Sequence, residues 1–167
     1  DIITYSTATA AVSVTLDSLG NGSAFGTGIG TDVLFGFEEV RGGSGDDILR
    51  AGPGWSGASY ADQTQGMVIS LAAGGMSDSA LGNDVFLDGI RGLQMYGAFD
   101  DTLTGSAGDD FIQPSGGSDV VDGGAGRDWI GFGGRVAAGA IVNLALGTAQ
   151  DGEGGTDSLT AIENVAG

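Results

Sequence analysis

Aspartate recurs every nine residues in the second half of the chain, and this period is the strongest constraint that the sequence places on its fold. The repeating residues are Asp101, Asp110, Asp119 and Asp128, and an aliphatic residue follows two positions after each: Leu103, Ile112, Val121 and Ile130. Glycines fill many positions between them, and glycine inside a helix costs about 1 kcal/mol relative to alanine. The pattern therefore predicts glycine-rich turns alternating with very short strands, whose aliphatic residue points inward. Stacked units of this kind form a parallel β-solenoid, which is stable only as an array.

A longer repeat surrounds these short units and occurs three times. Each copy has an aromatic residue near its start, namely Tyr5, Tyr60 or Phe132, followed by apolar segments such as Val12–Leu16 and Met67–Leu71 that read as strands. We expect a single all-β module over 1–167, with long repeats at about 1–41, 57–95 and 129–167 and nonapeptide repeats at about 42–56 and 96–131. The first copy lacks a start and the third stops in mid-pattern, so we interpret the chain as an excerpt of a longer protein.

The charge balance excludes several classes of function. The chain carries 22 Asp and Glu against 5 Arg, with no Lys, His or Cys, which gives a formal net charge of −17. Binding to a nucleic acid backbone is excluded by the absence of a basic footprint. Zinc sites built on Cys or His and disulfides are excluded as well, so a bound metal should be one that prefers oxygen ligands. No apolar run reaches about 18 residues, so we expect no membrane span.

Two segments match the nonapeptide G-G-x-G-x-D-x-U-x, where U is a large apolar residue. They are Gly42–Arg50 and Gly123–Gly131. On these motifs the chain resembles the RTX (haemolysin-type calcium-binding) repeat family. The long repeats are similar to the extended repeats of large secreted RTX proteins, in which Tyr-Ser, Val-x-Val-x-Leu, Gly-x-Asp-x-Leu and Ile-Glu-x-Val recur in that order. The resemblance implies an all-β parallel β-roll, or β-solenoid, with glycine-rich calcium-binding turns and Ca²⁺ as the cofactor. The chain departs from the motif at Ser56, where an aspartate is expected, and at 96–101 and 114–119, which lack several glycines.

The resemblance also implies where calcium binds. In the family, two nonapeptides make one turn of the roll, so Asp101 would stack on Asp119 and Asp110 on Asp128. Each calcium would lie between successive loops, held by the repeat aspartates and by backbone carbonyls. Asp47 is the corresponding ligand of the isolated repeat at Gly42–Arg50. Asp46, Asp100 and Asp109 stand one position earlier and are expected to be solvated.

A shorter form of the motif, Gly-x-Asp-x-U, lies in each long repeat. Its aspartates are Asp32, Asp84 and Asp157. They could be further calcium ligands, or they could accept backbone hydrogen bonds within turns. Together with the five nonapeptide aspartates they complete the set of candidate metal ligands.

The leading functional hypothesis is a non-catalytic module whose folding is coupled to calcium. The resemblance implies an extracellular bacterial protein, secreted or on the cell surface, exported by type I secretion, with calcium and the rest of the parent chain as partners. The alternative is a carbohydrate-binding or adhesive module for polysaccharide or a cell surface, in which Trp55 and Trp129 could stack on sugar rings rather than cap the solenoid. A third hypothesis, a polysaccharide lyase or epimerase on a β-helix, is disfavoured because Arg and Tyr are the only groups left to assist carboxylates.

Overall fold

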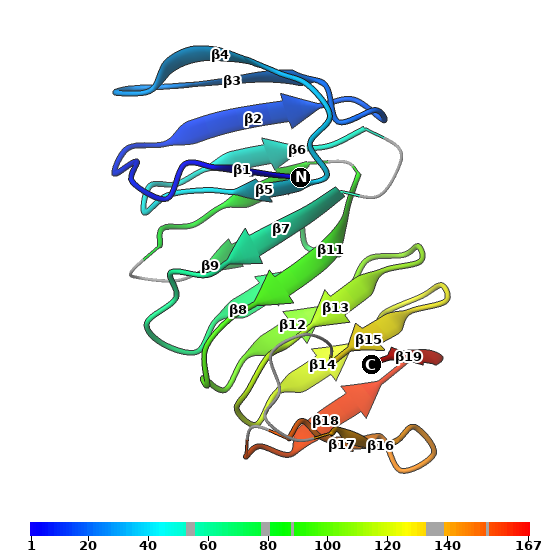
Figure 1. The fold of residues 1–167 in the computed structure, drawn as a ribbon. Helices are drawn as coiled ribbons and strands as arrows, with labels where there is room; N and C mark the ends of the chain where they lie inside the picture. The colour runs from blue at the N-terminus through cyan, green and yellow to red at the C-terminus, as the bar shows by residue number, and fades with distance from the viewer. Residues whose placement is uncertain (53–55, 78–80, 88, 133–138, 153) are drawn as a thin grey trace.

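The computed structural model describes residues 1–52, 56–77, 81–87, 89–132, 139–152 and 154–167. Every regular element in these ranges is a β-strand, and the strands form two sheets (Figure 1). The long repeats follow one another from the blue end to the red end in Figure 1. No helix capable of crossing a membrane occurs in the described part of the chain. Trp55 lies outside the described residues.

The first sheet has seven strands, all parallel, and is called the parallel sheet. Their order is β1 (Ile2–Thr4), β5 (Glu39–Arg41), β7 (Ser56–Tyr60), β11 (Ile90–Met95), β13 (Phe111–Gln113), β15 (Trp129–Gly131) and β19 (Asn164–Ala166).

The second sheet has twelve strands of mixed direction and is called the mixed sheet. Their order is β16 (Ile141–Asn143), β17 (Thr148–Gln150), β18 (Asp157–Thr160), β14 (Val120–Asp122), β12 (Thr102–Thr104), β8 (Val68–Ser70), β9 (Gly75–Ser77), β10 (Val85–Leu87), β6 (Ile48–Arg50), β2 (Val12–Leu16), β3 (Gly22–Gly26) and β4 (Gly30–Leu34).

The nonapeptide segment alternates between the two sheets, as the period predicts. Strands β12 and β14 lie in the mixed sheet and β13 and β15 in the parallel sheet, so residues eighteen apart are neighbours: Thr102 pairs with Val120 and Phe111 with Trp129. The aliphatic residue of each unit is fully buried, with 0% exposure at Leu103, Ile112, Val121 and Ile130. These side chains join a single apolar cluster to which both sheets contribute. The predicted strands, their inward residues and their stacking are confirmed.

The long repeats differ from the expected parallel solenoid. Each contains three consecutive strands in antiparallel order, namely β2-β3-β4, β8-β9-β10 and β16-β17-β18. The segment predicted as one strand over Met67–Leu71 is the short β8, after which the chain reverses. Gly74 and Gly147 allow this reversal because they adopt φ of 73° and 65° in the turns that follow β8 and β16.

Candidate metal centre

The candidate ligands gather at the start of the short strands, and nearly all of them are buried. Each nonapeptide aspartate immediately precedes a strand, and the exposure of Asp47, Asp101, Asp110, Asp119 and Asp128 is 1% or less. Asp84 and Asp157 of the long repeats are buried to the same degree. Burial of carboxylates disfavours their charged form unless other groups compensate.

One row of carboxylates runs along the mixed sheet and is called the Asp101 ladder. The N–H of Met67 donates to Asp101 Oδ1 (2.8 Å), and the N–H of Asp101 donates to Asp119 Oδ1 (2.8 Å). The N–H of Asp119 donates in turn to Asp157 Oδ1 (3.1 Å). The nonapeptide aspartates and the long-repeat aspartate therefore belong to one continuous stack.

A second row runs along the parallel sheet and is called the Asp110 ladder. The N–H of Asp110 donates to Asp128 Oδ1 (2.8 Å), and the N–H of Asp128 donates to Glu163 Oε2 (2.8 Å). Glu163 was not among the predicted ligands, because it lies outside the Gly-x-Asp motifs and is a glutamate. Its position directly before β19, matching that of Asp128 before β15, was the signal that could have identified it.

A third and shorter row, the Asp47 ladder, lies in the first half of the chain. The N–H of Val12 donates to Asp47 Oδ1 (2.7 Å), and the N–H of Asp47 donates to Asp84 Oδ1 (2.9 Å). Asp32 lies apart from the three ladders: it is half-buried in β4, whose described partner is the antiparallel β3. The structure thus brings seven of the eight predicted ligands into ladders and leaves Asp32 outside them.

In several of these carboxylates, protein donors occupy the second oxygen as well. Tyr60 Oη donates to Asp84 Oδ2 (3.0 Å), and the N–H of Gly43 donates to Asp47 Oδ2 (2.8 Å). Ser106 donates from its backbone to Asp110 Oδ2 (2.6 Å), and Arg91 Nη1 lies 3.8 Å from Asp110 Oδ1. Gln63 Nε2 lies 3.3 Å from both oxygens of Asp101. A metal ion at any of these carboxylates would therefore share its oxygens with protein donors or displace them.

Three other carboxylates keep an open oxygen. The Oδ2 atoms of Asp119, Asp128 and Asp157 are buried and have no hydrogen-bond partner among the residues that the structure describes. Burial, together with the neighbouring charges of Asp157, Asp101 and Asp151, raises the pKa of Asp119 to about 8. Burial likewise raises the pKa of Asp157 to about 6, and it also raises the pKa of Asp128. A buried carboxylate oxygen without a donor is stabilised when it binds a proton or a cation.

Two glycines create room beside carboxylate oxygens of the Asp110 ladder. A methyl group added to Gly123 would collide with the Ala161 carbonyl oxygen and would lie 2.7 Å from Asp128 Oδ2. One added to Gly105 would collide with the Gly123 carbonyl and lie 2.9 Å from Asp110 Oδ2. A carboxylate oxygen and a carbonyl oxygen of the next coil therefore converge on each glycine. This all-oxygen donor set suits calcium, which takes about six to eight such ligands.

Carboxylates alone do not complete a site in this geometry. Within the ranges that the structure describes, no group of three or more acidic side chains is placed to hold a metal ion. A bound ion would therefore draw on the backbone carbonyls beside the glycines as well as on the aspartates.

The aspartates one position before the ladders have a role that the sequence did not predict. Asp46, Asp100 and Asp109 are exposed, as expected, but each Oδ1 accepts a backbone N–H from the next coil. The donors are Asn83 (2.9 Å), Ser118 (2.8 Å) and Arg127 (2.9 Å). These contacts help to fix the spacing between coils on the solvent side.

Comparison with known proteins agrees with this geometry. The family model of the RTX calcium-binding nonapeptide repeat matches the chain in four copies, over residues 34–55 and 96–130. No curated protein and no solved structure matches the chain. The matched residues include Asp47 and the four aspartates of period nine.

Proposed function

We propose that calcium binds to the RTX-type repeats of this chain and induces the chain to fold as a structural module. The observation that carries the proposal is the stack of buried carboxylates with open Oδ2 atoms at Asp119, Asp128 and Asp157. RTX repeats are typical of secreted bacterial proteins, and we propose the same extracellular setting for the parent of this chain.

We propose that Asp119 and Asp128 are calcium ligands, each acting with the aspartate stacked on it, Asp101 or Asp110. Gly123 supports the assignment of Asp128 because it admits the Ala161 carbonyl oxygen next to Oδ2. Asp47 differs, because its Oδ2 accepts the N–H of Gly43 (2.8 Å) and the nearest atoms to a methyl group on Gly42 belong to Asp47 itself, so the proposal does not extend to Asp47. The alternation of the nonapeptides between two sheets supports a parallel β-roll as the architecture of this segment.

Electrostatics gives the reason for coupling between calcium and folding. Two carboxylates about 4.8 Å apart, the spacing of adjacent strands, repel by roughly 3–4 kcal/mol at an effective dielectric near 20. The unfolded chain relieves this repulsion by expanding, and a net charge of −17 favours expansion. A calcium ion supplies two positive charges and converts the repulsion into attraction, so its binding free energy becomes folding free energy.

Circular dichroism tests this proposal. We expect a chelator-treated sample to lack much of its β-sheet signal and to regain it when calcium is added at millimolar or lower concentration. A chain that is fully folded without calcium, and whose spectrum and melting temperature calcium leaves unchanged, would show that the proposal is wrong.

Substitutions test the assigned ligands. Asp128→Asn keeps the size of the side chain and removes its charge, so it should lower the number of calcium ions bound per chain, measured by equilibrium dialysis. Asp62→Asn is the matched control. Asp62 is exposed, and its substitution removes the same charge at a position outside the ladders. Equal calcium numbers in these two variants would contradict the assignment.

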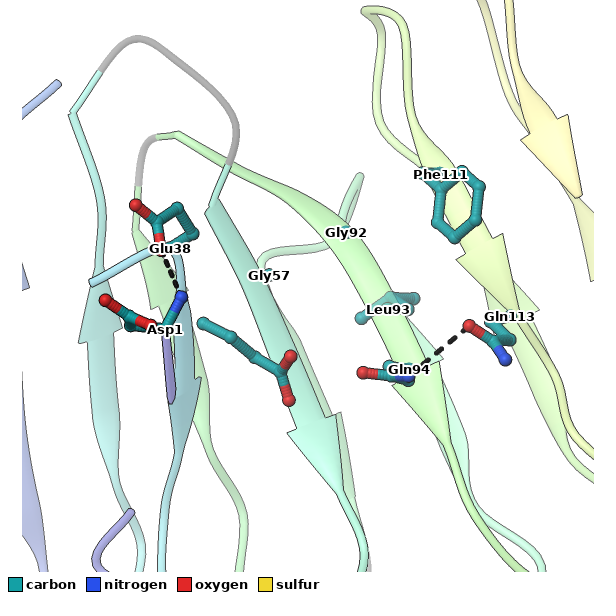
Figure 2. A pocket seen from close by; sticks show the side chains of 9 residues that line it. Asp1, Glu38, Gly57, Gly92, Leu93, Gln94, Phe111 and Gln113 are labelled. Carbon is teal, nitrogen blue, oxygen red and sulfur yellow. Dashed lines mark hydrogen bonds and ion pairs between the residues drawn. The ribbon is translucent and has the colours of Figure 1, made fainter. Parts of the chain in front are cut away.

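A second candidate function, carbohydrate binding, is favoured by the outer face of the parallel sheet. A groove of about 260 Å³ crosses this face, with a floor at Gly57 and Gly92. Figure 2 shows Phe111, Gln94 and Gln113 along it, with a hydrogen bond of 3.3 Å between the two glutamines. Trp129 pairs with Phe111 in register and is 38% exposed. Aromatic faces beside amide groups are suited to stacking on sugar rings and binding their hydroxyls.

Retention on an immobilised acidic polysaccharide such as alginate tests this second function. With calcium present, we expect Phe111→Ala, which removes the aromatic ring that lines the groove, to reduce retention about tenfold or more if the groove binds sugar rings. Val120→Ala is the control, because Val120 is 51% exposed in the mixed sheet rather than in the groove. Equal retention of both variants and the unmodified chain would exclude the groove as a carbohydrate site.

A further inference from the structure

The Gly-x-Asp-x-U aspartates of the three long repeats differ in the hydrogen-bond partner of their Oδ2 atom. In the first, Tyr5 Oη donates to Asp32 Oδ2 (3.0 Å), and in the second Tyr60 Oη donates to Asp84 Oδ2 (3.0 Å). The same relation thus recurs between the aromatic residue and the Gly-x-Asp-x-U aspartate. In both repeats the hydroxyl group occupies the carboxylate oxygen that a metal would use.

The third repeat lacks this hydroxyl group. Phe132 holds the equivalent place: its N–H donates to Ala166 O at the end of β19, as the N–H of Tyr5 donates to Arg41 O at the end of β5. Both residues are buried in the same apolar cluster, with 5% and 7% exposure. Asp157 is 1% exposed, and its Oδ2 has no hydrogen-bond partner within the described part of the chain.

Further oxygens surround Asp157. Its Oδ1 accepts the N–H of Asp119, whose own Oδ2 is also buried without a partner. A methyl group on Gly155 would collide with the Gly117 carbonyl oxygen and lie 3.1 Å from Asp151 Oδ2. Asp151 is fully buried, and its Oδ1 accepts the N–H groups of Gly154 (3.0 Å) and Gly155 (3.2 Å). Carboxylate and carbonyl oxygens therefore converge here, beyond the segment matched by the nonapeptide family.

We propose that the aromatic residue of each long repeat decides whether its aspartate binds calcium, so that Asp157 is a ligand and Asp84 and Asp32 are not. Tyrosine supplies a neutral donor that satisfies the carboxylate, whereas phenylalanine leaves the oxygen to a cation. Asp157 would share its ion with Asp119, and the Gly117 carbonyl would add a backbone oxygen to the donor set. The inference rests on the proposed calcium binding and adds a site of different composition to it.

Exchanging the aromatic residues tests the proposal in the full chain. With the calcium number measured by equilibrium dialysis, Phe132→Tyr should bind one ion fewer, and Asp157→Asn should lose the same ion, so that combining them causes no further loss. Tyr60→Phe, which only removes a hydroxyl group, should bind one ion more. Asp84→Asn is the control and should keep the number of the unmodified chain.

The outcomes separate this inference from the proposed function. If Asp128→Asn lowers the calcium number but either aromatic exchange leaves it unchanged, the aromatic rule is wrong and calcium binding by the nonapeptides stands. If the unmodified chain binds no calcium, both are wrong. Tyr60→Phe remains decisive if Phe132→Tyr does not fold, because it places no new atom in the core.

Discussion

In the absence of calcium, the chain is expected to be most stable in acid and to lose stability as the pH rises towards about 8. Burial and neighbouring charges raise the pKa of Asp157 to about 6, of Asp84 to about 7 and of Asp119 to about 8. A carboxyl group whose pKa is raised by folding binds its proton more tightly in the folded chain. Its contribution is therefore complete below the unfolded value near 3.8 and is lost as the pH passes through the folded value.

The size of this effect is set by the number of raised groups. Each pKa unit corresponds to about 1.4 kcal/mol, so the ladders together should change the stability by several kcal/mol between pH of about 4 and about 8. Thermal melts of the calcium-free chain across this range measure it. Saturating calcium should reverse the trend, because the ligands must lose their protons to bind metal. A calcium-free melting temperature that rises with pH over the same range would contradict the buried, stacked carboxylates.

The nonapeptide segment is the part of the fold that could be predicted most fully. Its period predicts the short strands and the buried aliphatic residue, because these properties are local or follow from stacking identical units. The pairing of residues eighteen apart came from the family resemblance, and the neighbours Thr102 and Val120 confirm it. The resemblance likewise implied that Asp101 and Asp119 would meet, and the N–H of Asp101 does donate to Asp119 Oδ1 at 2.8 Å.

The long repeats were less predictable because their structure depends on contacts between distant residues. The antiparallel strands follow from turns at single glycines such as Gly74. A prediction based on parallel stacking does not include such turns. Whether the oxygens of a carboxylate are already hydrogen-bonded depends on donors far away in the sequence. The donor is Tyr60 for Asp84 and Gln63 for Asp101. A motif of the form Gly-x-Asp therefore identifies the aspartate but does not show whether a protein group already occupies its oxygens.

Replacing Gly123 by alanine is expected to damage both the stack and its metal sites. The new methyl group would collide with the carbonyl oxygen of Ala161 in the neighbouring coil and would lie 2.7 Å from Asp128 Oδ2. Ala161 and Gly123 directly follow the paired strands β18 and β14, and the N–H of Gly123 donates to Thr160 O (2.9 Å). This bond holds the two turns together, so the coils must separate to admit the methyl group. We expect a loss of about 3 kcal/mol or more in the free energy of unfolding with calcium present. The calcium concentration at the folding midpoint should rise at least about tenfold, which corresponds to about 1.4 kcal/mol for a single ion.

Gly139→Ala separates this steric effect from the general cost of losing a glycine. No described atom lies within 4 Å of a methyl group at Gly139, so the change should stay within about 0.5 kcal/mol and leave the calcium midpoint in place. Neither glycine has a positive φ, so backbone strain does not distinguish the two positions. Equal melting temperatures and midpoints for the two variants would mean that the coils do not approach each other closely at Gly123. In that case the carbonyl of Ala161 and the carboxylate of Asp128 would not converge on one ion, because the close approach at Gly123 is what brings those two oxygens together.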